Sequence, residues 1–319
     1  MDAELISARF GLDGPLGEPV LAASGWGQRN LMWRLETRRG VFAVKDVIAD
    51  LLPDNPDVAV RTESLAHAAG VPSAEPVPST AGAAFELLEG RWYRCHRWVD
   101  GTGKQNEDTT AGDAHEMGIL VAGLHQLELE VGPLPPVTRY GRAHWLELAR
   151  QAPRTRWAGL IHENVDAIET AEAFGATFDD TTAIGSHCDL NAHNVLFTTA
   201  GLVLVDWDAA GPASASYERA STAVLWAQRH DGRLAHDVAA AFLRGYRDGG
   251  CTVSADDVAA LPRWLTGVAW WTERNVRIAL THPSDKHDEL ATHLVNALVD
   301  GVETVKEQQR FLRGVIATL

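Results

Sequence analysis

Two neighbouring stretches decide how this chain is interpreted: SHCDLNAHNVLF at residues 186–197 and VDWDAAGP at residues 205–212. The first places two histidines, a cysteine, an aspartate and two asparagines within one short segment. The second closes an aliphatic run with two aspartates. Such a cluster could form a metal site, a catalytic loop or a polar corner of an ordinary fold.

A zinc site or a hydrolase accounts poorly for these residues. His187, Cys188, Asp189 and His193 are possible metal ligands, but no CxxC or HxxxH spacing supports them, and adjacent Cys and His seldom converge on one ion. Neither Cys188 nor Cys251 lies in a nucleophile elbow, and the sequence contains no G-x-S-x-G.

A phosphoryl-transfer loop accounts for the whole cluster. His187, Asp189 and Asn194 form the pattern H-x-D-x-x-x-x-N, and Asp206 follows at the end of an aliphatic run. Phosphoryl transfer needs a carboxylate to orient the attacking hydroxyl and oxygen ligands for the magnesium that bridges the phosphates. Magnesium prefers hard oxygen ligands and keeps several waters, so the protein needs to supply only one Asp and one Asn as ligands.

The paired motifs resemble those of the aminoglycoside phosphotransferase family of small-molecule kinases, which share the protein-kinase fold. The metal-binding segment of that family reads D-W-x-x-A-G-x-P, and VDWDAAGP matches it at residues 205–212. The Leu124-His125 pair is also typical of the family. The resemblance extends from about residue 20 to the C-terminus. A protein kinase is disfavoured because no A-P-E follows Asp206.

The resemblance implies roles for the residues of the two motifs. Asp189 is expected to be the catalytic base or hydroxyl-orienting carboxylate. Asn194 and Asp206 are expected to bind Mg²⁺, and His187 to brace the loop. Asp208 could brace a loop or contact the metal. The family usually has glycine where this chain has Cys188, which raises a question about loop geometry.

The N-terminal half is expected to bind the nucleotide, ATP or GTP. Lys45 would pair with the phosphates, and Glu63 on the following helix would hold Lys45; a surface charge is the alternative for both. Ser24, Gly25 and Gly27 lie where a phosphate-covering loop is expected, although a plain hairpin turn also fits. The backbone from Trp98 to Val99 would face the base, while the Trp98 side chain could simply pack.

Local patterns predict an α+β fold with two lobes. A turn at Gly40 leads into a strand over 41–45, a helix follows over 57–69, and two strands flank Glu89-Gly90. We therefore predict a small antiparallel sheet with one helix over residues 1–100 and a hinge near 96–102. A mainly helical lobe would cover 103–319, with the catalytic loop at 187–194, a hairpin after it, and one long helix over 287–316.

Composition limits the class of protein and its partners. The chain has 319 residues, 45% hydrophobic and 22% charged, as in soluble globular proteins, and three scattered cysteines. An acidic, polar start predicts no signal peptide and a cytoplasmic location. The net charge of −15 repels nucleic acid and anionic membranes and favours cationic partners.

The acceptor is expected to be a small hydroxylated molecule. A cationic acceptor would need carboxylates, and the candidates are Glu218, Glu273, Asp285, Asp288 and Glu289. Trp270, Trp271 and Glu273 could form an aromatic and acidic wall, or the tryptophans could be core residues. An antibiotic of the aminoglycoside type is favoured. A kinase of choline, sugar or a hydroxylated amino acid and a catalytically inactive nucleotide-binding regulator are the alternatives.

Overall fold

The computed structural model describes residues 1–24, 30–47, 55–178 and 182–319. These residues form two compact units. The first contains residues 1–108, 122–132 and 184–211, and the second contains residues 109–121, 133–183 and 212–319. The candidate loop and most of the candidate metal segment thus belong to the same compact unit as the N-terminal sheet. The hinge predicted near 96–102 stays a prediction.

The first unit is built on an antiparallel sheet with strand order β1-β2-β3-β6-β4, in which β5 pairs with β6. The strands are β1 Val20–Ser24, β2 Asn30–Thr37, β3 Gly40–Val47, β4 Pro76–Val77, β5 Phe85–Leu88 and β6 Arg91–Arg97. The predicted turn at Gly40 and the two strands around Glu89-Gly90 are confirmed.

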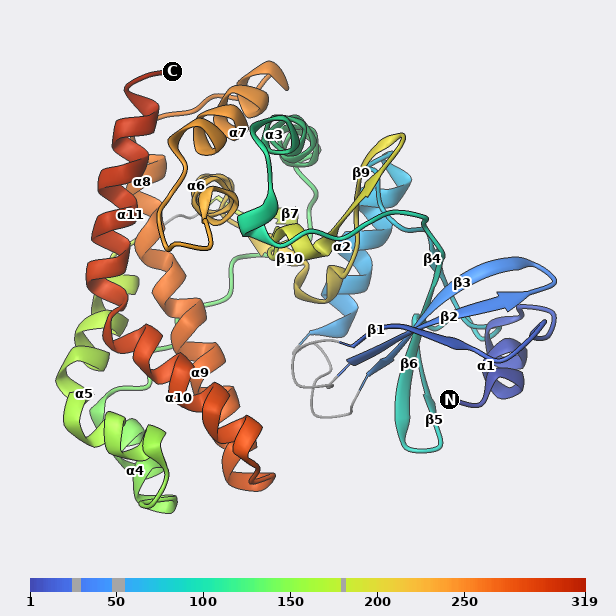
Figure 1. Ribbon diagram of the computed structural model, residues 1–319, viewed down its shortest axis with the longest axis horizontal. Coiled ribbons are helices and arrows are strands. Elements are labelled where there is room, and N and C mark those ends of the chain that lie inside the picture. The colour runs from blue at the N-terminus through green and yellow to red at the C-terminus, as the bar shows by residue number, and fades with distance from the viewer. Residues whose placement is uncertain (25–29, 48–54, 179–181) are drawn as a thin grey trace. The chain divides into compact units, whose positions relative to one another are not determined.

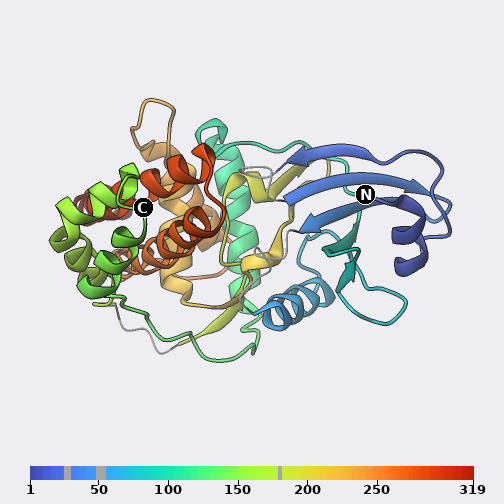
Figure 2. The same ribbon diagram turned by 90° about the horizontal axis from the view of Figure 1, so that it is seen from below.

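The period of two along a strand gives the sheet two different faces. On β3, Phe42 and Val44 point into an apolar cluster with Ile6 and Phe10 of α1 (Ala3–Phe10). Lys45 directly follows Val44 and, because successive side chains alternate, belongs to the other face. Figure 1 shows α1 beside the turn between β2 and β3, and Figure 2 shows the same strands side by side.

The N-terminal region contains α1 in addition to the expected helix, so the prediction of one helix there is wrong. The second helix, α2 (Pro56–Ala68), matches the predicted one. The side chain of Asp2 caps the start of α1, and Gly11, in the left-handed conformation, ends it. With only eight residues, α1 is too short for a clear helical period, and its stability comes from burying Ile6 and Phe10.

Further first-unit elements carry the candidate loop and the segment that follows it. They are β7 Ile184–Ser186, a 3-10 turn at Ala192–Asn194, the hairpin β8 Val195–Thr198 and β9 Gly201–Leu204, and a 3-10 turn at Trp207–Ala209. The predicted hairpin after the loop is confirmed. It places Asp206 just after β9, between the hairpin and the second turn.

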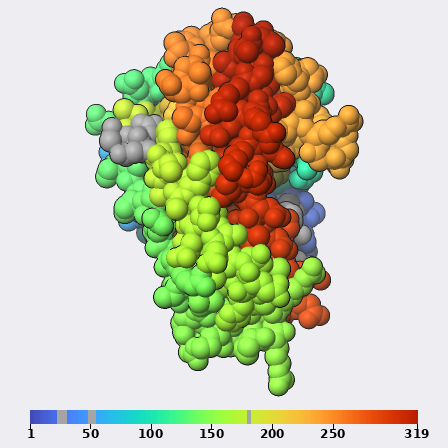
Figure 3. Space-filling view, turned by 90° about the vertical axis from the view of Figure 1, so that its left-hand side faces the viewer, coloured from blue at the N-terminus to red at the C-terminus, as the bar shows by residue number. Residues whose placement is uncertain are grey.

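The rest of the chain is mostly helical. Its elements are α3 Ala111–Gln126, α4 Arg142–Gln151, α5 Arg156–Gly175, β10 Gly211–Ala213, α6 Ala215–Ala227, α7 His236–Asp248, α8 Asp257–Ala260, α9 Trp264–Thr281, α10 Asp285–Val299 and α11 Gly301–Ile316. The helix α10 packs against both α5 and α9, and Figure 3 shows the red C-terminal helices beside the green α4 and α5. None of the helices in the described residues is both long and apolar enough to cross a membrane.

The long helix predicted over 287–316 is interrupted. It divides at Asp300 into α10 and α11. A Cβ atom at Gly301 would lie 2.3 Å from Cδ2 of Leu265, so any other residue there would force the Leu265 side chain of α9 to shift. The apolar stripe from Leu290 to Val305 therefore runs across two helices.

Candidate active site

His187 connects the candidate loop to the segment that carries Asp206. Its side chain is fully buried, and Nε2–H donates to the carbonyl of Val205 at 2.9 Å. The ring also lies 4.7 Å from the ring of Trp207, measured between centroids. These contacts hold the two motif segments side by side, which is the kind of bracing expected of His187.

The loop turns sharply between His187 and Asp189. Cys188 has φ of 63°, in the left-handed region that glycine adopts most easily. Its Sγ lies 3.5 Å from the carbonyl oxygen of Gly211. The family's usual glycine is thus replaced by a residue that must adopt the same backbone conformation. Asp206 also has positive φ, 60°.

Asp189 is held by side-chain amides. Asn194 Nδ2 donates to Asp189 Oδ2 at 2.8 Å and to the Asp189 carbonyl at 2.9 Å, and Asn191 Nδ2 donates to Oδ1. Asn106 supports this arrangement, because it donates to Asn191 Oδ1 at 3.0 Å and accepts from the backbone N–H of Ala192 at 2.8 Å. Both oxygens of the Asp189 carboxylate therefore accept a hydrogen bond, which fixes the orientation of the carboxylate.

Lys45 lies between the two aspartates of the second motif. Its Nζ donates to Asp206 Oδ1 at 2.7 Å and to Asp208 Oδ2 at 2.5 Å. Burial disfavours the ammonium, but the attraction of Asp206 and Asp208 outweighs it and raises the pKa of Lys45 above its ordinary value. Lys45 therefore stays charged throughout the physiological pH range.

The expected pairing of Glu63 with Lys45 is not formed, so that prediction is wrong. Glu63 instead forms an ion pair with Arg94 and lies 3.0 Å from His96 Nε2. The sheet register explains the difference. Arg94 is the β6 partner of Lys45, so it emerges on the same face, and its guanidinium binds Glu63 together with Asp208, at 2.9 Å.

Charge pairing keeps the carboxylates of Glu63 and Asp208 ionised. Burial alone would raise the pKa of Glu63, but the hydrogen bond and charge of His96 and the charge of Arg94 lower it below its ordinary value. Burial opposes ionisation of Asp208 too, and Lys45 and Arg94 together lower its pKa. The result is an ionic network in which three carboxylates face two permanent cations.

Comparison with known proteins identifies the family. The profile described as phosphotransferase enzyme family matches residues 21–250. The chain belongs to this family. As a member it is an ATP-dependent phosphotransferase, a kinase of small molecules. A search of curated protein sequences finds no significant match.

Solved structures show the kinase-like fold of the family. A spectinomycin phosphotransferase aligns with TM-score 0.66 at 13% identity, over 96% of this chain and 97% of the other. An amicoumacin kinase aligns with TM-score 0.65 at 12% identity, over 94% of each chain. An ethanolamine kinase from Plasmodium vivax aligns with TM-score 0.61 at 12% identity, over 88% of this chain and 81% of the other. The predicted α+β kinase-like fold is confirmed.

The side chains expected to bind magnesium have the right chemistry. Asn194 uses its NH₂ group to hold Asp189, so its Oδ1 faces no donor among the described residues. The Asp206 side chain is 42% exposed, and only one of its oxygens accepts from Lys45. An amide oxygen and a carboxylate oxygen are hard ligands of the kind that Mg²⁺ prefers.

The expected nucleotide-covering segments are described only in part. Ser24 ends β1, whereas Gly25 and Gly27 lie outside the described residues. The backbone N–H of Trp98 donates to the carbonyl of Val41 at 3.0 Å, which extends the sheet. That N–H is therefore committed and cannot also donate to a base.

The residues expected to bind the acceptor lie in the second unit and differ in exposure. Trp270 and Trp271 are 40% and 36% exposed and stack with centroids 5.7 Å apart, so they are not core residues. Glu273 is buried and already paired with His144 and Arg277. Glu218 is also buried, and Asp285 is exposed in the first turn of α10.

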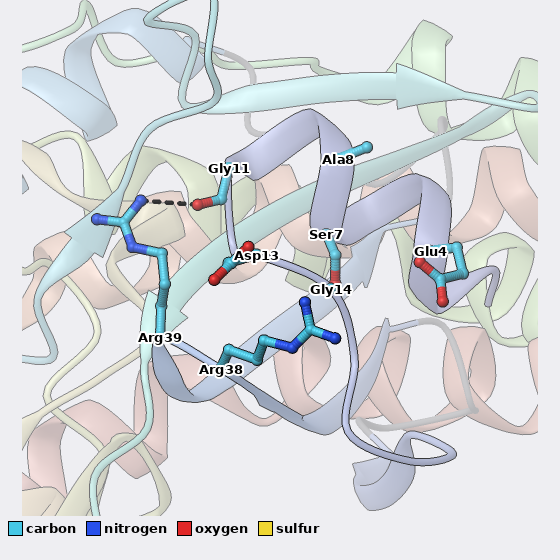
Figure 4. A pocket seen from close by; sticks show the side chains of 8 residues that line it. All are labelled: Glu4, Ser7, Ala8, Gly11, Asp13, Gly14, Arg38 and Arg39. Atoms are coloured by element: carbon cyan, nitrogen blue, oxygen red, sulfur yellow. Dashed lines mark hydrogen bonds between the residues drawn. The ribbon is translucent and has the colours of Figure 1, made fainter.

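The first unit contains a hollow beside α1. It has a volume of about 580 Å³ and is lined by α1, the residues after it and the β2–β3 turn, with Ser7, Asp13, Arg38 and Arg39 among its residues (Figure 4). Arg39 donates to the carbonyl of Gly11 there, at 2.7 Å. None of the motif residues lines it.

Sequence reasoning missed four residues of the network: Asn106, Asn191, Arg94 and His96. Asn191 lies inside the motif, and its amide could have been noticed there. Arg94 and His96 alternate with Cys95 on a predicted strand, but nothing local to that strand shows which face meets Lys45. Asn106 is 85 residues from its partner Asn191, and no local pattern links them.

Proposed function

We propose that the chain transfers the γ-phosphate of ATP or GTP to a hydroxyl of a small molecule, with Mg²⁺, and that the acceptor is an antibiotic with a cationic or sugar-like part. This proposal rests mainly on one observation. Asp189 and Lys45 belong to one compact unit, where Asp189 is hydrogen-bonded to Asn194 and Lys45 to Asp206. O-phosphorylation would then confer resistance.

Each of these residues would have its own role in the phosphoryl transfer. The Asp189 carboxylate orients the acceptor hydroxyl and takes its proton as the new oxygen–phosphorus bond forms. Asn194 and Asp206 would hold the metal, which neutralises charge on the phosphate oxygens when bound. The Lys45 ammonium would bind the phosphates, and the bond from the γ-phosphorus to the bridging oxygen would break.

The aromatic pair of the second unit supports a ring-shaped acceptor. Trp270 and Trp271 are exposed, and such side chains stack on sugar rings and on cations. Glu273 is compensated by Arg277 and His144, so it adds little net negative charge for a cation. A sugar-like ring is therefore better supported than a polycation, and the spectinomycin and amicoumacin enzymes are antibiotic kinases of this fold.

A second candidate is a kinase of a small amino alcohol. The ethanolamine kinase from Plasmodium vivax has the same fold, at TM-score 0.61. Such an acceptor is smaller and would not use a stacking platform. Truncation of Trp270 would then leave the activity unchanged.

The test is a phosphorylation screen with purified protein. Aminoglycosides, spectinomycin-like antibiotics, macrolides, choline, ethanolamine and sugars would each be incubated with Mg-ATP or Mg-GTP. Nucleoside diphosphate release and the mass of the product would be measured, with Asp189→Ala as the control. Turnover by the wild type alone supports the proposal. Equal turnover by the variant with its true acceptor would refute it.

A further inference from the structure

The geometry points to Asp208, rather than Glu63, as the carboxylate that positions Lys45, with Arg94 holding Asp208 in place. This inference rests on the proposed function, because it takes Lys45 as a ligand of the nucleotide phosphates. It assigns positioning roles to two residues of this chain. In the kinase pattern, a glutamate on the helix, here Glu63, is expected to position the lysine instead.

Each oxygen of Asp208 has its own cation. Oδ2 accepts from Lys45 Nζ at 2.5 Å, and Oδ1 accepts from Arg94 Nη1 at 2.9 Å. The Arg94 side chain is only 3% exposed, so its position is fixed by packing as well as by charge. A carboxylate bound on both sides in this way cannot move without breaking a charge-assisted hydrogen bond.

Asp206 is poorly suited to be the lasting partner of Lys45. Its side chain is 42% exposed, against 20% for Asp208, and the proposed function needs its oxygens for the metal. An ammonium has three N–H donors. If Asp206 turns to a metal, Lys45 keeps its bond to Asp208 and has two donors for phosphate oxygens.

Glu63 is committed elsewhere. Its side chain is 1% exposed, one oxygen pairs with Arg94, and the other lies 3.0 Å from His96 Nε2. Moving Glu63 to Lys45 would cost the buried Arg94 one of its two carboxylate partners and would break the contact with His96. Glu63 therefore acts on Lys45 only indirectly, through Arg94 and Asp208.

The experiment compares Asp208→Asn with Glu63→Gln in the full chain. Nucleotide Kd would be measured by calorimetry without acceptor, and KM and kcat with it. We expect Asp208→Asn to raise nucleotide Kd and KM roughly 10- to 100-fold, the effect of losing a charge-assisted hydrogen bond. Glu63→Gln should change Kd less than about threefold, although it lowers the unfolding temperature.

Three further variants keep the result interpretable. Asp208→Glu preserves the charge and should recover part of the affinity. Asp46→Asn is the matched control, because Asp46, a buried carboxylate on β3, is likewise paired with an arginine, Arg91 at 2.7 Å, but lies on the face of the sheet opposite Lys45. It should lower stability and leave Kd unchanged. In a Lys45→Met background, Asp208→Asn should add no further loss of affinity.

The outcomes distinguish the inference from the proposed function. If Lys45→Met raises Kd while Asp208→Asn does not, or if Glu63→Gln equals Asp208→Asn, the inference is overturned and the nucleotide site stands. If Lys45→Met leaves nucleotide affinity unchanged, the proposed function itself fails.

Discussion

The two parts of the candidate site are built from different interactions. Around Asp189, neutral amides hold the carboxylate: Asn194 and Asn191 donate to it, and Asn106 supports Asn191. Around Lys45, full charges hold one another in a chain that runs from Asp206 through Lys45, Asp208 and Arg94 to Glu63. The first part leaves a carboxylate available to react, and the second pairs each of its carboxylates with at least one cation.

This difference has consequences for sensitivity. The amide donors around Asp189 carry no charge and do not titrate, whereas ion pairs depend on the protonation of every member. Loss of one member leaves an uncompensated charge in a dry site. We therefore expect changes near Asp189 to affect turnover and changes near Arg94 to affect folding.

The largest expected effect is on turnover, from Asp189→Asn. The substitution keeps the size of the side chain but removes the proton acceptor. We expect kcat to fall roughly 10²- to 10⁴-fold, the usual worth of a general base. The nucleotide Kd, measured by calorimetry, should change by less than about threefold, because Asp189 contacts the acceptor side. A rise in nucleotide Kd as large as the fall in kcat would show that Asp189 also binds the nucleotide, so the two parts of the site would not have separate roles.

The next effect is on stability, from Arg94→Met. The variant leaves the carboxylates of Glu63 and Asp208 with one cation fewer. We expect a loss of about 3–5 kcal/mol in the free energy of unfolding, measured by urea denaturation. The double variant Arg94→Met with Glu63→Gln should recover part of it, since the stranded charge is removed. An unchanged single variant would show that the ionic chain contributes nothing to the fold.

Low pH should remove the stability that the ion pairs of Glu63 and Asp208 contribute. The pKa values of Glu63 and Asp208 are lowered in the folded chain, so their contribution is present above the ordinary carboxyl pKa of about 4 and is lost as the pH falls through the lower folded values. Urea denaturation from pH 6 downwards should show stability falling below about pH 4. The fall should be shallower in Glu63→Gln. Parallel curves for the two proteins would contradict the assignment of Glu63.

How far sequence could predict these two parts follows from the range of their interactions. Local period and turn residues indicated β3 with Lys45, α2 with Glu63 and the hairpin that ends at Asp206, and motif spacing grouped Asp189 with Asn194. The partner of Glu63 could not be predicted in that way. It depends on the pairing of Lys45 with Arg94 across two strands, and a one-residue shift of that register would move Arg94 to the other face.

The smallest effect tests the turn that joins the two parts, through Cys188→Gly. Cys188 has φ of 63°, which costs a residue with a Cβ atom about 1 kcal/mol relative to glycine. Glycine also gains freedom in the unfolded chain, so we expect a net stabilisation of at most about 1 kcal/mol. Cys188→Ala is the control, because it removes the thiol but keeps the Cβ atom, and it should not stabilise. If both variants gain equally, the thiol rather than the backbone is the source of strain. If only glycine gains, with kcat unchanged, the loop carries a conformational cost that turnover does not require.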